Sequence, residues 1–165
     1  MIRIFLKLIV FLLITEKVFA CSLNFRTFGS KPDFQNLPVK PISFDDKKGG
    51  SMFYVPVENF CKDKPLVGTM VIFYYLNNEL TKIGLERHNF NDRELLKLAV
   101  RNYGNFNRSL GKDEQKWVGM HIWQTNNEII NFVAVDNERN RFEKLEISSK
   151  KYLNQTLKSS PLLVQ

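Results

Sequence analysis

The chain has 165 residues, with 24 Lys and Arg against 17 Asp and Glu, and its net charge is +7 at pH 7. The two signs of charge are interspersed rather than blocked, so the basic balance indicates solubility or an anionic partner. No motif for binding nucleic acid is present, and nucleic-acid binding is therefore excluded from the expected functions.

Residues 1–20 have the pattern of a secretory leader. Arg3 and Lys7 are basic, 8–14 is a short apolar core, and Ala20 ends a small-residue cleavage site. The apolar run is too short to span a bilayer. We therefore expect a signal peptide and a protein exported to the periplasm or outer envelope of a bacterial cell. Cleavage leaves 145 residues and removes three basic residues and one acidic residue, so the net charge falls to +5.

Cys21, the first residue after the cleavage point, has two alternative fates. As the cysteine of a degenerate lipobox it would be diacylated, and the protein would be anchored to a membrane. After ordinary cleavage it could form a disulfide with Cys61, the other cysteine of the chain. That disulfide would close a loop of about 40 residues and stabilise the fold by roughly 4 kcal/mol. Because lipidation would leave Cys61 unpaired in an oxidising compartment, the disulfide is favoured.

An extended N-terminal arm is predicted at 21–50, where Pro and Gly interrupt the chain and no periodic pattern is present. The folded domain is expected at 51–149. Its first strand is predicted at 51–57, and Pro56 restricts this strand to an edge or shortens it.

A β-hairpin is predicted around Asn77 and Asn78, because Asn tolerates the positive φ angles of tight hairpin turns. The two strands of this hairpin are expected at 67–76 and 80–87. The first of them is apolar on both faces, which indicates a central strand that is covered on both sides.

The clearest helical pattern lies between Asn91 and Gly104. Asn91 is the predicted N-cap, Glu94 is its capping-box partner, and Gly104 is expected to end the helix. The apolar side chains recur at the spacing of one helical face, which we expect to pack on the sheet. This face consists of Leu95, Leu96, Ala99, Val100 and Tyr103.

The opposite face of the predicted helix carries Arg93, Lys97 and Arg101 at steps of four residues. We expect these side chains to form a positive stripe in contact with solvent. The stripe is either a solvated surface or a docking surface for an acidic partner.

After a polar loop, three further strands are predicted at 117–123, 128–136 and 142–148, and a polar C-terminal tail at 150–165. Strands, one helix and further strands in this order are typical of an α+β domain. We predict a single domain with a largely antiparallel sheet of about five to seven strands and one main helix packed on it.

Alternation along 117–123 separates two sets of side chains. Trp117, His121 and Trp123 share one face with Gly119. A shallow binding platform is one interpretation of this aromatic face, and we expect the aliphatic face to pack under the helix. Burial of the aromatic face by the N-terminal arm is the alternative. The aliphatic set is Val118, Met120 and Ile122.

No pattern of catalytic, metal or cofactor chemistry is present. His88 and His121 are far apart, and the chain has no zinc-ligand spacing, nucleophile elbow, phosphate loop or dinucleotide fingerprint. We therefore expect no metal and no cofactor.

The expected function is that of an exported, non-catalytic binding protein of the inhibitor or immunity type, with another protein as its partner. Two alternatives stay open: a membrane-anchored envelope lipoprotein with a structural or assembly role, and an envelope hydrolase that uses His121. The sequence leaves the oligomeric state open.

Overall fold

The computed structural model describes part of the chain. The predicted signal peptide, Cys21, and most of the predicted arm and C-terminal tail lie outside this part, so they stay predictions. The described residues are 27–32, 42–45, 50–61, 64–89, 92–105, 117–137 and 140–152.

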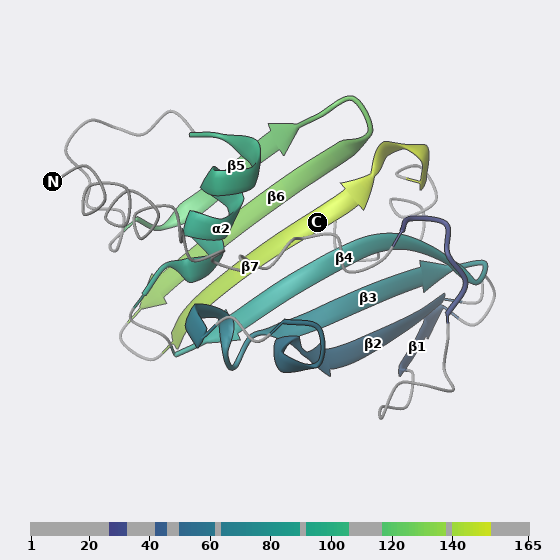
Figure 1. Ribbon diagram of the computed structural model, residues 1–165, viewed down its shortest axis with the longest axis horizontal. Helices are drawn as coiled ribbons and strands as arrows, with labels where there is room; N and C mark the ends of the chain where they lie inside the picture. Colours follow the sequence, from purple (N-terminus) through teal and green to yellow (C-terminus); the bar gives the residue numbers. More distant parts are fainter. Residues whose placement is uncertain are drawn as a thin grey trace, which may run out of the picture.

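The described residues form seven strands and one α-helix (Figure 1). The helix is α2 (Glu94–Tyr103), and short 3-10 turns lie at Val57–Asn59, Lys64–Leu66 and Lys150–Tyr152. The strands are β1 (Ile42–Asp45), β2 (Gly50–Pro56), β3 (Met70–Leu76), β4 (Glu79–His88), β5 (Gly119–Gln124), β6 (Glu128–Asn137) and β7 (Asn140–Ser149).

All seven strands belong to one antiparallel sheet with the spatial order β1-β2-β3-β4-β7-β6-β5. Strands β1 to β4 form one meander, and β5 to β7 form a second one after α2 (Figure 1). The pairing of β4 with β7 joins the two meanders into a continuous sheet. This arrangement confirms the predicted α+β domain.

The predicted hairpin is confirmed between β3 and β4. Asn77 and Asn78 have φ angles of 51° and 60°, as a tight primed turn requires. β3 is an interior strand, and it is buried on both faces: Phe73 is in the main core, while Ile72 and Leu76 are buried on the other face.

Pro56 is the last residue of β2 and lies opposite Met70 of β3. β1 pairs with β2 only between Gly50 and Met52, so the proline stands where β2 has no partner on that side. The strand predicted at 51–57 is observed at Gly50–Pro56 with the same length, and the proline lies at its end, where β2 is an edge on one side. β1 itself comes from the segment predicted as an arm, which therefore contributes an edge strand to the sheet.

Helix α2 crosses β6 and β7 on one face of the sheet, which we call the inner face (Figure 1). Its apolar side packs on the sheet as predicted, and Leu98 adds to the predicted set. The core between helix and sheet includes Leu95, Leu96, Leu98 and Ala99 of α2 with Phe53, Phe73, Leu85, Phe132 and Leu145 of the strands.

The start of α2 differs from the predicted capping box. Arg93 is the N-cap and makes no side-chain cap hydrogen bond, and Glu94 is the first helical residue. The Leu95 N–H donates instead to the carboxylate of Glu143 on β7 at 3.3 Å. The capping-box prediction is therefore wrong, because a carboxylate from a distant strand satisfies the helix N-terminus. The predicted cap Asn91 lies outside the described residues.

Gly104 ends α2 as predicted. Its φ of +87° turns the chain away from the helix, and its N–H donates to the Val100 carbonyl at 2.8 Å.

Candidate functional site

Strand β5 presents its aromatic side chains to the core. Trp123 is 8% exposed, and its indole N–H donates to the Gly104 carbonyl at 2.9 Å. The Tyr103 ring lies 6.3 Å from the Trp123 ring, and Trp117 stacks on Phe132 of β6 at 5.9 Å. The end of α2 thus gives Trp123 both the apolar contact and the hydrogen-bond acceptor that a buried indole requires.

This placement corrects the predicted roles of the two faces of β5. The prediction that Trp117, His121 and Trp123 form a solvent-facing platform is wrong in direction, because α2 lies on that face. The aliphatic set faces away from the helix.

The outer face of the sheet, opposite α2, carries exposed apolar side chains on β5, on β6 and on Val118, the residue before β5. Val118, Met120 and Ile122 are 48%, 61% and 47% exposed, and Val135 of β6 is 40% exposed. Met120 lies opposite Val133 of β6, so these positions are adjacent on two paired strands. We call Val118, Met120, Ile122 and Val135 the outer patch. They are four of the six large hydrophobic side chains exposed in the described part of the chain.

Charged side chains on β4 and β7 border the outer patch. Lys82 and Lys144 contact the Glu146 carboxylate at 3.2 Å and 3.0 Å, and Lys82 lies 4.1 Å from the centre of the Tyr74 ring. Burial alone would raise the pKa of Glu146, but the two ammonium groups hold that pKa below its ordinary value. The face therefore combines an apolar area with a charged border, as protein interfaces do.

Gly119 allows Trp117 to fold back onto the core at the start of β5. Its φ is +136°, and a Cβ at this position would lie 3.3 Å from the Trp117 ring. A larger residue would strain the backbone and displace the indole. Sequence reasoning missed this role, although a glycine between two tryptophans was the available signal.

His121 packs on the inner face of β5. Its ring meets the Trp123 ring edge-on at 4.4 Å, and desolvation by burial lowers the pKa of the imidazole. The His121 ring is only partly buried, and its contact with the Trp123 indole adds to the packing of the inner face.

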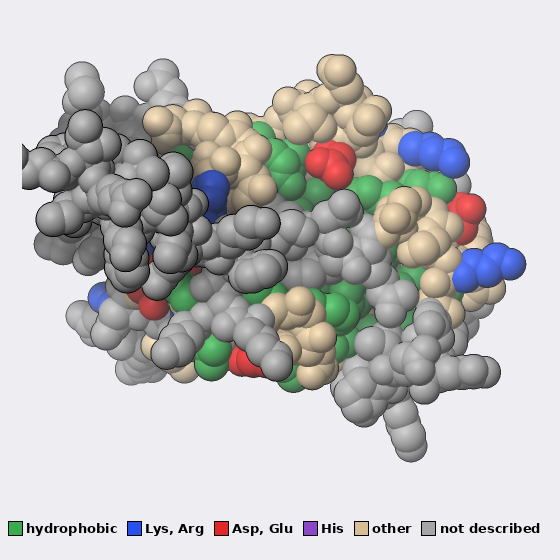
Figure 2. Space-filling view, in the orientation of Figure 1, with side chains coloured by type: hydrophobic (Ala, Val, Ile, Leu, Met, Phe, Trp, Pro, Cys, Tyr) green, Lys and Arg blue, Asp and Glu red, His purple; other side chains and the backbone are tan. Residues whose placement is uncertain are grey.

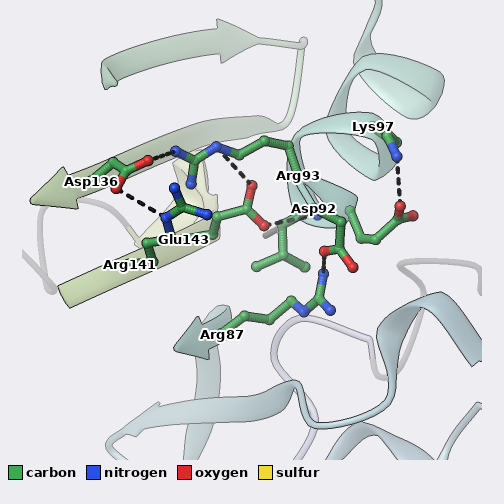
Figure 3. Close-up of polar contacts among 9 residues, drawn as sticks. Arg87, Asp92, Arg93, Lys97, Asp136, Arg141 and Glu143 are labelled. Atoms are coloured by element: carbon green, nitrogen blue, oxygen red, sulfur yellow. Dashed lines mark hydrogen bonds and ion pairs between the residues drawn. The ribbon is translucent and has the colours of Figure 1, made fainter. Parts of the chain in front are cut away.

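A cluster of buried charges lies at the N-terminal end of α2, where β4 and β6 end and β7 begins (Figure 3). Arg87 of β4 pairs with Asp92 at 2.6 Å. Arg93 lies 3.5 Å from Asp136 of β6 and 3.9 Å from Glu143 of β7. The two arginines are each 2% exposed, whereas the Asp92 and Asp136 side chains are 44% and 22% exposed, so these ion pairs connect the start of the helix to three strands at the margin of the core.

The burial of Arg93 corrects the predicted positive stripe. Lys97 and Arg101 are exposed as predicted, and Lys97 pairs with Glu94 at 2.7 Å. Arg93 turns inward because Asp136 and Glu143, which sequence spacing could not connect to it, lie beside it in the fold. Figure 2 shows the face that carries α2, on which Lys and Arg side chains are scattered singly rather than gathered.

Burial raises the pKa of Glu143 to about 7, although the Leu95 N–H and the guanidinium groups of Arg93 and Arg87 lower it. The Glu143 carboxyl group is almost fully shielded from solvent, at 2% exposure. It is therefore placed to cap α2 and to couple stability to pH.

Cys61 is disulfide-bonded and packs against the core. Cys21 lies outside the described residues, so the predicted Cys21–Cys61 pairing and its lipidation alternative both stay predictions.

In the described residues, no group of three or more His, Cys, Asp and Glu could hold a metal ion. No helix in this part of the chain is long and apolar enough to cross a membrane. Neither a protein-family model, nor a curated protein, nor a solved structure matches the chain.

Proposed function

We propose that the protein binds another protein through the outer patch. The observation that carries this proposal is the gathering of four apolar side chains, 40% to 61% exposed, on two paired strands and on Val118 at the start of one of them. Covering apolar surface is favourable by about 25 cal/mol per Å². A partner with an apolar centre and a polar border would complement both the patch and the charges beside it.

The predicted export places this surface outside the cytoplasm, where an inhibitor or immunity-type protein meets its target. An acidic partner has less support than the sequence alone suggested. Arg93 is buried, and the remaining cations of the predicted stripe, Lys97 and Arg101, are on the helix rather than beside the outer patch.

Affinity capture tests the proposal. The chain, expressed from Met1 with a C-terminal tag in the cells that produce it, is recovered with its stoichiometric partners, which are identified by mass spectrometry. The dissociation constant of the recovered partner is then measured against wild type, Met120→Lys and Val135→Lys. Because each lysine places a charge within the apolar contact, we expect each to weaken binding by about tenfold or more.

Arg101→Glu is the matched control, because it also changes charge at an exposed position but lies on α2. We expect it to leave the dissociation constant within about twofold. Recovery of no stoichiometric protein would contradict the proposal. A loss of binding in Arg101→Glu with full binding in Met120→Lys would move the contact to the helix.

A further inference from the structure

The outer edge of β5 carries backbone groups that meet no strand of the described chain. The Thr125 N–H donates to the Glu128 carbonyl at 3.0 Å, which makes these two residues a hydrogen-bonded pair of the β5–β6 hairpin. Hydrogen-bonded and non-hydrogen-bonded positions alternate along antiparallel strands. The N–H and C=O groups of Met120, Ile122 and Gln124 therefore point away from β6. β5 is the last strand in the sheet, so no described strand lies on that side.

The two edges of the sheet differ in how they are protected. β1 has four residues, and a register shift between Ser43 and Asp45 interrupts its pairing. β5 has six residues in unbroken register with β6, and its sequence GMHIWQ contains no charged residue and no proline. Natural edge strands are usually blocked by charge, proline, a bulge or short length. β5 has none of these features and is competent to pair with another strand.

We propose that two copies of the chain pair through β5, antiparallel and about a two-fold axis perpendicular to the sheet. Such an axis reverses strand direction without turning the sheet over, so the outer faces of both copies stay on the same side. With His121 at the axis, Met120 of each copy lies opposite Ile122 of the other. Both of these residues have outward backbone groups, and the two sheets become continuous.

A second copy is the occupant that β5 itself fits. The pairing places apolar side chains opposite apolar side chains on the outer face, and no like charges from the two strands meet. The outward N–H and C=O groups occur at every second residue in both copies, so the donors of one strand lie opposite the acceptors of the other. Two short strands bury less surface area than a standard protein interface does, so we expect the dimer to form at micromolar or higher concentration.

Pairing would also join the two outer patches across the axis into one larger apolar surface. The dimer goes beyond the proposed function, because it uses the backbone edge of β5, whereas the proposed protein partner covers the outer face. Val135 separates the two, since it belongs to the outer patch but lies on β6, one strand in from the edge.

Sedimentation equilibrium tests the dimer. The chain is expressed from Met1, purified in the form to which the cell processes it, and studied at roughly 1 µM to 1 mM. We expect the average mass to rise from monomer toward dimer. Met120→Lys and Ile122→Lys should each raise the dimer dissociation constant by about tenfold or more, because charge on an edge strand opposes pairing. Val135→Lys, the matched control, should change it by less than about twofold.

A monomer at every concentration overturns the dimer and leaves the proposed function standing. A dimer that Val135→Lys weakens as strongly as Met120→Lys overturns pairing at the edge, because that result places the contact on the face. A second measurement needs no variant. Amide hydrogen exchange by NMR should slow at Met120, Ile122 and Gln124 as concentration rises, and unchanged exchange at these amides in a protein that does dimerise overturns β5 as the contact.

Discussion

The two faces of β5 alternate along a single strand, yet they are held in place by different means. The inner face has aromatic rings that pack under α2, and the Trp123 indole is hydrogen-bonded to the end of that helix. The outer face has aliphatic side chains that remain 47% to 61% exposed. The larger aromatic side chains of this strand therefore serve the fold, while the smaller aliphatic ones stay exposed.

The largest expected effect is a difference in the free energy of unfolding between substitutions on the inner face and on the outer face of β5. Trp123→Ala removes a buried indole and leaves the Gly104 carbonyl without its donor, so we expect a loss of about 4 kcal/mol in the free energy of unfolding. Met120→Ala on the outer face should change it by less than about 0.5 kcal/mol. Urea denaturation followed by circular dichroism measures both. Equal losses in the two variants would mean that the outer face also belongs to the core.

Arg93 and Arg101, near the two ends of α2, give a second contrast between a buried and an exposed side chain. Arg93→Ala leaves Asp136 and Glu143 without a buried cation, and we expect it to destabilise the protein by about 3 kcal/mol. Arg101→Ala, at an exposed position, should stay within about 0.5 kcal/mol. Thermal denaturation of both variants checks this difference, and a stable Arg93→Ala would restore the solvent-exposed stripe that the sequence suggested.

The pH dependence of stability tests whether Glu143, in the buried cluster, holds a proton in the folded protein. The pKa of Glu143 is raised from 4.5 to about 7, mainly by burial, so the folded protein holds this proton more tightly than the unfolded chain does. The stabilisation is complete below about pH 4.5 and is lost as the pH rises through about 7. We expect this contribution to be about 3 kcal/mol.

Glu143→Gln removes the titration and keeps a side-chain acceptor for the Leu95 N–H. The difference between wild type and this variant isolates Glu143 from His121, whose lowered pKa acts in the opposite direction as the pH falls. Denaturation curves from pH 4.5 to 8 measure the difference. A flat difference across this range would show that Glu143 is ionised throughout.

Among the substitutions expected to destabilise the protein, Gly119→Ala has the smallest effect. Gly119→Ala forces a side chain into a backbone with φ of +136° and against the Trp117 ring, and it should cost about 1.5 kcal/mol. The fluorescence of Trp117 should shift toward longer wavelength as its ring leaves Phe132. Unchanged stability and fluorescence would contradict the packing described for the start of β5.

Local signals in the sequence predicted much of the fold. Asn77 and Asn78 supply the backbone angles of a tight turn, and the spacing of Leu95, Leu96 and Ala99 is that of one helical face, so both elements follow from residues close together in the chain. Both predictions are confirmed because neither depends on distant partners.

The candidate site was harder to predict, because alternation says which side chains share a face but not which face is buried. Both faces of β5 are apolar, and only the position of Gly104 at the end of α2 decides that Trp123 is inside. Arg93 is a similar case. Its burial depends on Asp136 and Glu143, which are distant in the sequence and lie beside it only in the folded sheet.

Site-specific photo-crosslinking tests the central claim most directly. The photoreactive residue p-benzoylphenylalanine replaces Met120 on the outer patch or Arg101 on α2, in cells that produce the protein, and adducts are resolved after irradiation. The outer patch as a protein-binding surface predicts a discrete adduct with another protein from position 120 and none from position 101. An adduct from position 101 with none from position 120 would contradict it, as would the absence of adducts from both positions.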